Sequence, residues 1–239
     1  MKMTKRIIPD TITACNLLCG AVATYLATQH AFMLAFCFIL LGAFFDFFDG
    51  LSARLLNVPS KIGIELDSLA DVITFGLAPA MLVACYYLPI LGWWSFIALV
   101  MAAFSALRLA KFNVDERQTS SFIGLATPAN AIFWGGICSM PYGFTTGIVT
   151  SWGLLALTLV SCWLLVSEIP FFSLKFKNFT WSDNYDKYIF LGGAVILIVF
   201  CAVKAYLAKR LGFLLFSGTG VILWYVVLNI LNNMIKPKK

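Results

Sequence analysis

Four aspartates that lie in apolar stretches of the chain are the first residues that suggest chemistry. Asp46 and Asp49 stand three residues apart, and Asp67 and Asp71 stand four apart, so each pair shares one face of a helix. An acidic side chain inside a membrane costs about 2.5–3.5 kcal/mol, which makes such residues functional candidates by default. Only a short connection separates the two pairs, and it would make their helices antiparallel neighbours. We therefore expect the four carboxylates to converge.

Converging carboxylates in a site of low dielectric need a positive partner, because like charges at close range resist ionising together. One or two divalent cations would provide it. All-oxygen ligation suits Mg²⁺, Mn²⁺ or Ca²⁺, whereas zinc and copper favour the histidine and thiolate ligands that are lacking here. Magnesium is commonly held by a few carboxylates together with substrate phosphates, so a phosphorylated substrate is expected. The small Gly50 and Ala53 leave room for it, and Arg54 could pair with a phosphate oxygen.

The composition requires these residues to be positioned by membrane helices. Of the 239 residues, 61% are hydrophobic and only 12% are charged, whereas about 25% are charged in ordinary soluble domains. This excludes a soluble globular protein and predicts an all-α integral membrane protein. We expect a single catalytic domain over residues 1–239, with a core over about 1–166 and additional helices over about 188–231. The apolar runs predict about eight transmembrane helices, near Ile12–Thr28, Ala31–Leu55, Leu69–Leu88, Leu91–Leu109, Pro128–Tyr142, Trp152–Val166, Tyr188–Tyr206 and Leu211–Leu231.

The basic residues lie mostly in the termini and in the connections between apolar runs. With a net charge of +6, this distribution fits the positive-inside bias of membrane proteins and not nucleic-acid binding. An even number of spans places both termini on one side, and their lysines make that side cytoplasmic, together with the aspartates. Lys204, Lys209 and Arg210 would then face the opposite side. They leave the topology of the last two helices open.

The run D-x2-D-G-x2-A-R-x8-G-x3-D-x3-D, from Asp46 to Asp71, resembles the complete signature of the CDP-alcohol phosphatidyltransferases. The resemblance implies a helical membrane enzyme that displaces CMP from a CDP-linked lipid with an alcohol. It also implies a role for each position of the motif. Metal ligands would be Asp46, Asp49, Asp67 and Asp71, with Asp71 also the general base, and contacts to the CDP-lipid would come from Gly50, Ala53, Arg54 and Gly63.

Further segments resemble the integral-membrane phosphatidylserine synthases of that family: Ile8–Gly20, Glu65–Ala80, Arg108–Asn113 and Phe122–Pro128. Ala126 departs from the pattern, because a proline is expected at this place. The resemblance implies CDP-diacylglycerol as donor, L-serine as acceptor, and phosphatidylserine and CMP as products. It also implies a divalent cofactor, Mg²⁺ or Mn²⁺, the inner membrane of a bacterium as the location, and a homodimer, as is common in the family.

Serine carries a carboxylate, so its pocket should contain a cation. Arg108 and Lys111, at the inner end of the fourth predicted span, are the candidates, with Asn113 and Thr127 as polar neighbours. The alternative is that both cations extend to the lipid headgroups as anchors of the helix.

Thr13 and Asn16 stand three residues apart on the first predicted span. They could line the nucleotide site, or they could form ordinary hydrogen bonds between helices.

Two other functions remain open from the residues. A transferase for glycerol 3-phosphate or inositol phosphate would want an additional cluster of Arg or Lys near the acids, and cations are sparse there. A cation-coupled transporter would also place carboxylates in the membrane, but transporters commonly have duplicated halves, and these acids occur once.

Overall fold

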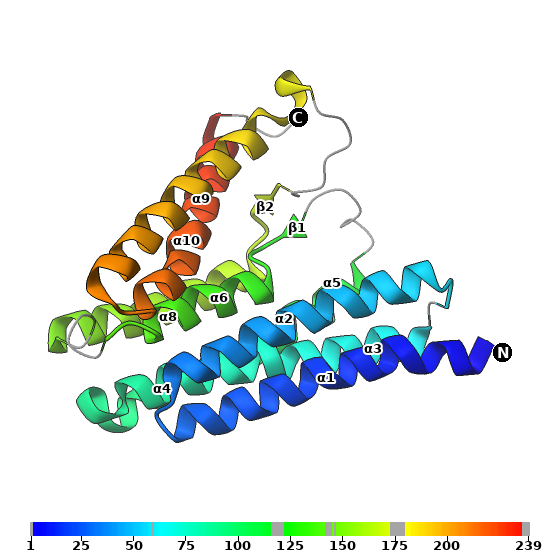
Figure 1. The fold of residues 1–239 in the computed structure, drawn as a ribbon, viewed down its shortest axis with the longest axis horizontal. Coiled ribbons are helices and arrows are strands. Elements are labelled where there is room, and N and C mark those ends of the chain that lie inside the picture. Colours follow the sequence, from blue (N-terminus) through cyan, green and yellow to red (C-terminus); the bar gives the residue numbers. More distant parts are fainter. Residues whose placement is uncertain are drawn as a thin grey trace.

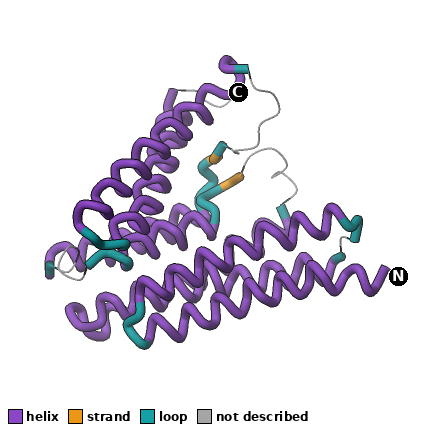
Figure 2. Tube along the Cα trace, viewed as in Figure 1, coloured by secondary structure: helices purple, strands orange, loops and turns teal. Residues whose placement is uncertain are grey.

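The computed structural model describes residues 2–58, 60–115, 122–141, 145, 147–172 and 180–235. Helix accounts for almost all of this part of the chain (Figure 2). The α-helices are α1 (Lys2–Thr28), α2 (Phe32–Leu55), α3 (Lys61–Asp71), α4 (Ala78–Leu91), α5 (Val100–Val114), α6 (Thr127–Cys138), α8 (Ile148–Val166), α9 (Trp181–Ala208) and α10 (Gly212–Ile235). A π-helical segment, η1 (Val72–Leu77), joins α3 to α4, and a 3₁₀ segment, η2 (Gly92–Leu99), precedes α5.

Six helical stretches of the described chain are long and apolar enough to cross a membrane. One of them, Lys61–Val114, includes α3, α4 and α5 and reverses direction at Gly92, whose φ of +55° is a conformation that glycine adopts without steric cost. The expected all-α membrane protein is confirmed. The count of eight crossings stays a prediction. The fifth predicted span corresponds to α6, which has only 12 residues and is not among these six stretches.

The helices form two groups that meet along α6. The helices α1 to α5 run lengthwise together in one bundle, and α9 and α10 pair with each other at an angle to it (Figure 1). The α10 helix packs against α6, which itself packs against α2 and α4. The largest buried side chains, Trp134, Tyr86, Tyr87, Phe36 and Phe75, fill the space where these helices meet.

Two very short strands connect distant parts of the chain. β1 (Phe122–Ile123) precedes α6, and β2 (Pro170–Phe171) follows α8, and the two pair in antiparallel fashion. Gly124 follows β1 with a φ of +75°, and its N–H donates to the carbonyl of Ile169 at 2.9 Å. The start of α6 and the end of α8 are therefore held together.

Several helices begin earlier than the apolar pattern predicts, because hydropathy marks the part of a helix in the membrane and not its polar end turns. α1 begins at Lys2 instead of Ile12, the helix that carries the second pair of acids begins at Lys61 instead of Leu69, and α9 begins at Trp181 instead of Tyr188. These added turns matter for the site, since those of α1 and α3 carry residues that line it.

The prolines lie within helical structure more often than their sequence positions suggest. Pro9 is inside α1 and Pro89 is inside the last turn of α4, although both fall outside the predicted spans. Pro79 stands at the first turn of α4, directly after the π segment. Proline has no N–H to bond to the carbonyl four residues earlier. The α-helical hydrogen-bond pattern is therefore interrupted at Pro79, close to where the π segment changes to the α-helix α4.

Candidate active site

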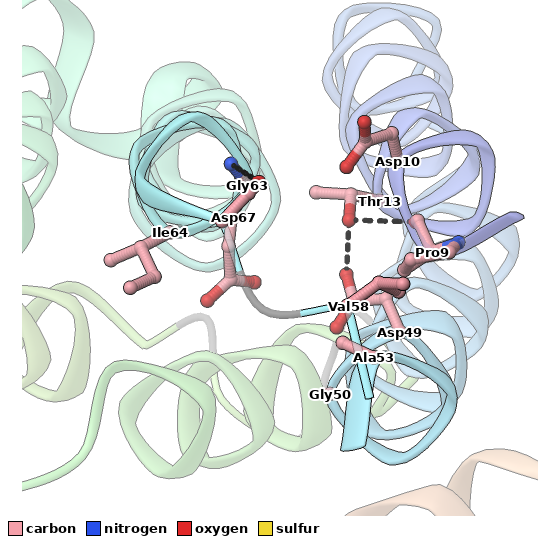
Figure 3. Close-up of a pocket in the computed structure, with 11 residues that line it drawn as sticks. Pro9, Asp10, Thr13, Asp49, Gly50, Ala53, Val58, Gly63, Ile64 and Asp67 are labelled. Carbon is pink, nitrogen blue, oxygen red and sulfur yellow. Dashed lines mark hydrogen bonds between the residues drawn. The ribbon is translucent and has the colours of Figure 1, made fainter. Parts of the chain in front are cut away.

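Three of the four predicted acids meet between α2 and α3. One carboxylate oxygen each from Asp46, Asp49 and Asp67 lies within 4.8 Å of the other two. Asp49 is 6% exposed, and Asp67 Oδ1 is buried with no hydrogen-bond partner. Figure 3 shows Asp49 and Asp67 projecting from different helices into one pocket. Three converging carboxylate oxygens form a ligand set suited to a hard divalent cation.

Asp71 lies one turn further along α3 and has a different environment. It is 8% exposed and is not one of the three acids whose oxygens converge. Its Oδ1 accepts a hydrogen bond from Asn16 Nδ2 at 3.2 Å. Asn16 is fully buried in α1, and its backbone carbonyl accepts a bond from the Thr74 hydroxyl at 2.9 Å. The carboxylate of Asp71 is thus held from α1.

Thr13 holds a second acid from the same helix. Its hydroxyl donates to Asp49 Oδ2 at 2.6 Å, as the dashed line in Figure 3 shows. Thr13 and Asn16 are three residues apart and face the acids of α2 and α3 respectively, so one face of α1 orients carboxylates on two other helices. Thr13 and Asn16 therefore form hydrogen bonds between helices, which was one of the two interpretations offered by the sequence.

The turn between α2 and α3 is fixed by backbone hydrogen bonds. Asn57 adopts a φ of +52°, which asparagine tolerates better than most residues. Its N–H donates to the carbonyl of Arg54, and the N–H of Val58 donates to that of Ala53, which together form a Schellman motif. The motif ends α2 directly after the acid-bearing turn and reverses the chain, so that α3 can present its own acids to those of α2.

A pocket of about 140 Å³ opens beside the acids, between α1, α2 and α3. Five signature positions line it: Asp49, Gly50, Ala53, Gly63 and Asp67. The other lining residues are Pro9, Asp10, Thr13, Val58, Ser60 and Ile64.

Pro9, Asp10 and Ser60 were not among the predicted site residues. Ser60 caps α3, since its hydroxyl accepts the N–H of Gly63 at 2.8 Å, and a serine just before a helix is a recognisable signal for this role. Asp10 could have been suspected only as an acid next to an apolar run, because its approach to the pocket depends on how α1 packs against α3.

Gly50 and Arg54 shape the open side of this pocket. A Cβ atom at Gly50 would meet only Arg54 Nη2, at 3.9 Å, so the helix surface there faces open space. Arg54 is exposed, and its Nε donates to the carbonyl of Gly50 at 2.9 Å. The guanidinium therefore stands next to the pocket with nitrogens available for an anionic ligand.

Two of the four predicted acceptor residues share a second, smaller pocket. Arg108 and Lys111 on α5 line a cavity of about 40 Å³ against the end of α8. Arg108 is 7% exposed, and its Nε has no hydrogen-bond partner. Thr127 is buried in the first turn of α6, and Asn113 donates to the hydroxyl of Ser68 at 2.9 Å; neither of them lines this cavity.

The second pocket lies alongside the acid-bearing helix. On α5, Ser105 lies against Gly76 and Asn113 bonds to Ser68, so α5 runs antiparallel to α3 and η1. Arg108, between these two contacts, is about level with Asp71. A ligand held by Arg108 would therefore lie close to Asp71.

Comparison with known proteins agrees with this geometry. Residues 6–174 match the family model described as CDP-alcohol phosphatidyltransferase. The chain belongs to the CDP-alcohol phosphatidyltransferase family. The matched range of this family member begins in α1 and includes both pockets, whereas α9 and α10 lie beyond it.

Three relatives of this transferase, from different organisms, share one name. A protein of Bacillus subtilis named CDP-diacylglycerol--serine O-phosphatidyltransferase is 41% identical over 168 residues, which are 69% of this chain and 89% of that protein. Proteins of that name from Helicobacter pylori and Mycobacterium bovis are 37% identical over 134 residues and 31% identical over 217 residues. The aligned parts are 53% of this chain and 54% of the Helicobacter protein, and 86% of this chain and 72% of the Mycobacterium protein.

Proposed function

We propose that this transferase moves the phosphatidyl group of CDP-diacylglycerol to the hydroxyl of L-serine, giving phosphatidylserine and CMP. The observation that carries the proposal is the meeting of Asp46, Asp49 and Asp67 beside a pocket whose lining includes Gly50, Ala53 and Gly63 of the family signature. The serine-transferase name of the relatives supports the acceptor. We place the enzyme in the cytoplasmic membrane of a bacterium, with both termini and the site on the cytoplasmic side.

The donor set fits a divalent ion, Mg²⁺ or Mn²⁺. The ligands would be Asp46, Asp49 and Asp67, whose oxygens already lie together, with Asp71 as a further ligand from the next turn of α3. The unpaired buried oxygen of Asp67 supports this assignment, since a buried carboxylate oxygen without a partner is costly. When bound, the ion would neutralise the diphosphate and the charge that develops on the leaving CMP.

The residues around the first pocket would hold the CDP-lipid. The open surface at Gly50 and Ala53 would admit the nucleotide, and Gly63 would let it approach the start of α3. Arg54 would exchange its bond to the Gly50 carbonyl for a diphosphate oxygen, a stronger partner because both groups are charged. Thr13 and Asn16 would act through the acids that they hold.

In the chemical step, the serine hydroxyl oxygen forms a bond to the phosphorus of the phosphatidyl group. The bond from that phosphorus to the CMP oxygen breaks, and CMP leaves with the electron pair. Asp71 takes the hydroxyl proton, with Asn16 fixing the direction of its carboxylate. Arg108 binds the serine carboxylate, and its position level with Asp71 supports this role.

The test measures CMP release by the purified protein in detergent with CDP-diacylglycerol, Mn²⁺ or Mg²⁺, and a panel of alcohols. We expect release that depends on L-serine and on the metal, and that stops on chelation and returns with added ion. Release only with another alcohol, such as glycerol 3-phosphate, would reassign the acceptor. No release with any alcohol would refute the enzyme assignment.

A further inference from the structure

The second pocket has charged side chains of both signs on its walls. Arg108, Lys111 and Asp115 come from α5, and Glu168 comes from the segment that follows α8. A cavity of about 40 Å³ has room for about three water molecules. A cavity of this size is too small for a sugar phosphate.

The buried cation in the pocket has a donor that is free to bind an anion. Arg108 as a whole residue is only 7% exposed, and its Nε is buried with no hydrogen-bond partner. Arg108 lies over the ring of Phe112, with 5.9 Å from Cζ to the ring centroid, a contact that orients the guanidinium without satisfying its N–H groups. Leaving a buried charged donor unpaired is costly, so a ligand carboxylate is the natural partner.

The opposite wall is held rigidly by backbone bonds. The N–H of Leu125 donates to the carbonyl of Leu164, and that of Gly124 donates to Ile169, on the two sides of Glu168. A Cβ atom at Gly124 would lie 3.0 Å from the carbonyl oxygen of Ser167, so the two segments are in close contact. Glu168 itself is exposed at the mouth of the pocket, and among the described residues no partner takes up its carboxylate.

We infer that Glu168 binds the ammonium group of the acceptor and thereby selects an amino acid over other alcohols. The inference rests on the proposed function, of which it specifies the acceptor. A zwitterion fits walls of opposite charge, with its carboxylate at Arg108 and its ammonium at Glu168. A phosphorylated alcohol would bring its negative charges close to the carboxylates of Glu168 and Asp115. The repulsion would weaken its binding, so these acids also discriminate against phosphorylated acceptors.

The test compares L-serine with 3-hydroxypropionate, which is serine without its amino group, in the whole protein and in Glu168→Gln. A hydrogen bond to a charged group contributes about 1.5–3 kcal/mol, so kcat/KM for serine should fall at least about tenfold in the variant. The value for 3-hydroxypropionate and the KM for CDP-diacylglycerol should not change. A serine to 3-hydroxypropionate ratio that stays the same in Glu168→Gln would overturn the inference.

Two further arms keep the result interpretable. Asp186→Asn removes an acid from α9 that lines neither pocket, and the ratio should match that of the unchanged protein. In the unchanged protein, L-alanine should inhibit serine transfer at least about tenfold better than propionate, because only alanine carries the ammonium group; equal inhibition would refute the inference even if Glu168→Gln does not fold. If the unchanged protein makes no use of serine, the proposed function itself fails.

Discussion

Neutral side chains on α1 give the acids of the site different surroundings. Asp49 receives a hydroxyl from Thr13, and Asp71 receives an amide from Asn16, while Asp67 keeps a buried oxygen with no partner. A carboxylate held by a single hydrogen bond keeps other lone pairs for a ligand or a proton. The geometry therefore supports different roles for these aspartates, although in the sequence they appear only as two similarly spaced pairs.

The first prediction concerns Asp71 as the proton acceptor. In Asp71→Asn the side chain keeps its shape but cannot take a proton, so kcat should fall by about 10²–10⁴. Binding of CDP-diacylglycerol should persist, because the three converging acids remain. The measurements are CMP release and equilibrium binding of the CDP-lipid. Activity close to that of the unchanged protein would exclude Asp71 as the base.

A second prediction concerns Thr13, which acts through Asp49. In Thr13→Val the carboxylate loses its hydrogen bond, and groups that orient metal ligands typically contribute 10- to 100-fold in affinity. The Mn²⁺ concentration that gives half-maximal activity should rise by about that factor. Thr13→Ser keeps the hydroxyl and should restore most of the affinity. Equal behaviour of the Val and Ser variants would show that the bond to Asp49 is irrelevant to the metal.

For individual residues, the sequence predicts the positions of the aspartates better than it predicts which side chains contact them. The spacing of the aspartates places each pair on one face, since that follows from helical periodicity alone. That Asp71 stands apart from the other three, or that Asp10 lines the pocket, depends on the packing of α1 against α2 and α3. Such packing leaves no periodic trace in the sequence.

At the scale of the elements, α1 and η1 are in close contact at a glycine. A Cβ atom at Gly20 would lie 2.6 Å from the Cα of Thr74, a backbone atom that cannot move aside by itself. Thr74 also bonds to the carbonyl of Asn16, so the contact at Gly20 and the hydrogen bond that reaches Asp71 belong to one interface. The absence of a side chain lets α1 lie close enough to hold the acid.

A third prediction follows for Gly20→Ala. The added methyl group should force α1 and η1 apart and cost about 1–3 kcal/mol of unfolding free energy, as overpacking does. Turnover should also decrease, because Asn16 would move away from Asp71. Gly153→Ala is the control, since nothing lies within 4 Å of its Cβ position; alanine there should be neutral or stabilising by up to about 1 kcal/mol. Denaturant unfolding in detergent measures both, and equal effects would contradict the close contact.

The elements were predictable where hydropathy decides them and not where hydrogen bonding does. Apolar runs located most helices of the described chain, but the first turns of α1 and α9 and most of α3 lie outside those runs. The π segment Val72–Leu77 could not be foreseen, because its residues are compatible with an ordinary α-helix and only the bond pattern distinguishes the two.

For the whole molecule, the C-terminal helices do more than cover an apolar surface. Asn229 of α10 accepts the N–H of Phe172 at 2.7 Å, and Tyr225 donates to the carbonyl of the same residue at 2.8 Å. Phe172 directly follows β2, which ties the end of α8 to the start of α6. The helices beyond the family match thus fix the segment that carries Glu168.

A fourth prediction tests this attachment. Asn229 is 2% exposed, and in Asn229→Ala the Phe172 N–H loses its partner, at a cost of about 1–3 kcal/mol of unfolding free energy. Asn233→Ala removes an exposed hydrogen bond to the carbonyl of Pro170 and should change the free energy of unfolding by no more than about 0.5 kcal/mol. Thermal unfolding in detergent measures the difference, and similar values for the two variants would show that α10 does not hold this segment. No local pattern predicts contacts between residues so far apart in the chain.

The π segment between Asp71 and Pro79 sets the rotational phase between two halves of one long helix. Each residue of an α-helix advances the chain by about 100° around its axis. Insertion or deletion of one residue there would swing the carboxylates of Asp67 and Asp71 away from α2 while α4 kept its place in the core. The length of Val72–Leu77, a stretch that bears none of the proposed metal ligands, is thus as strict a requirement for the chemistry as the identity of the acids themselves.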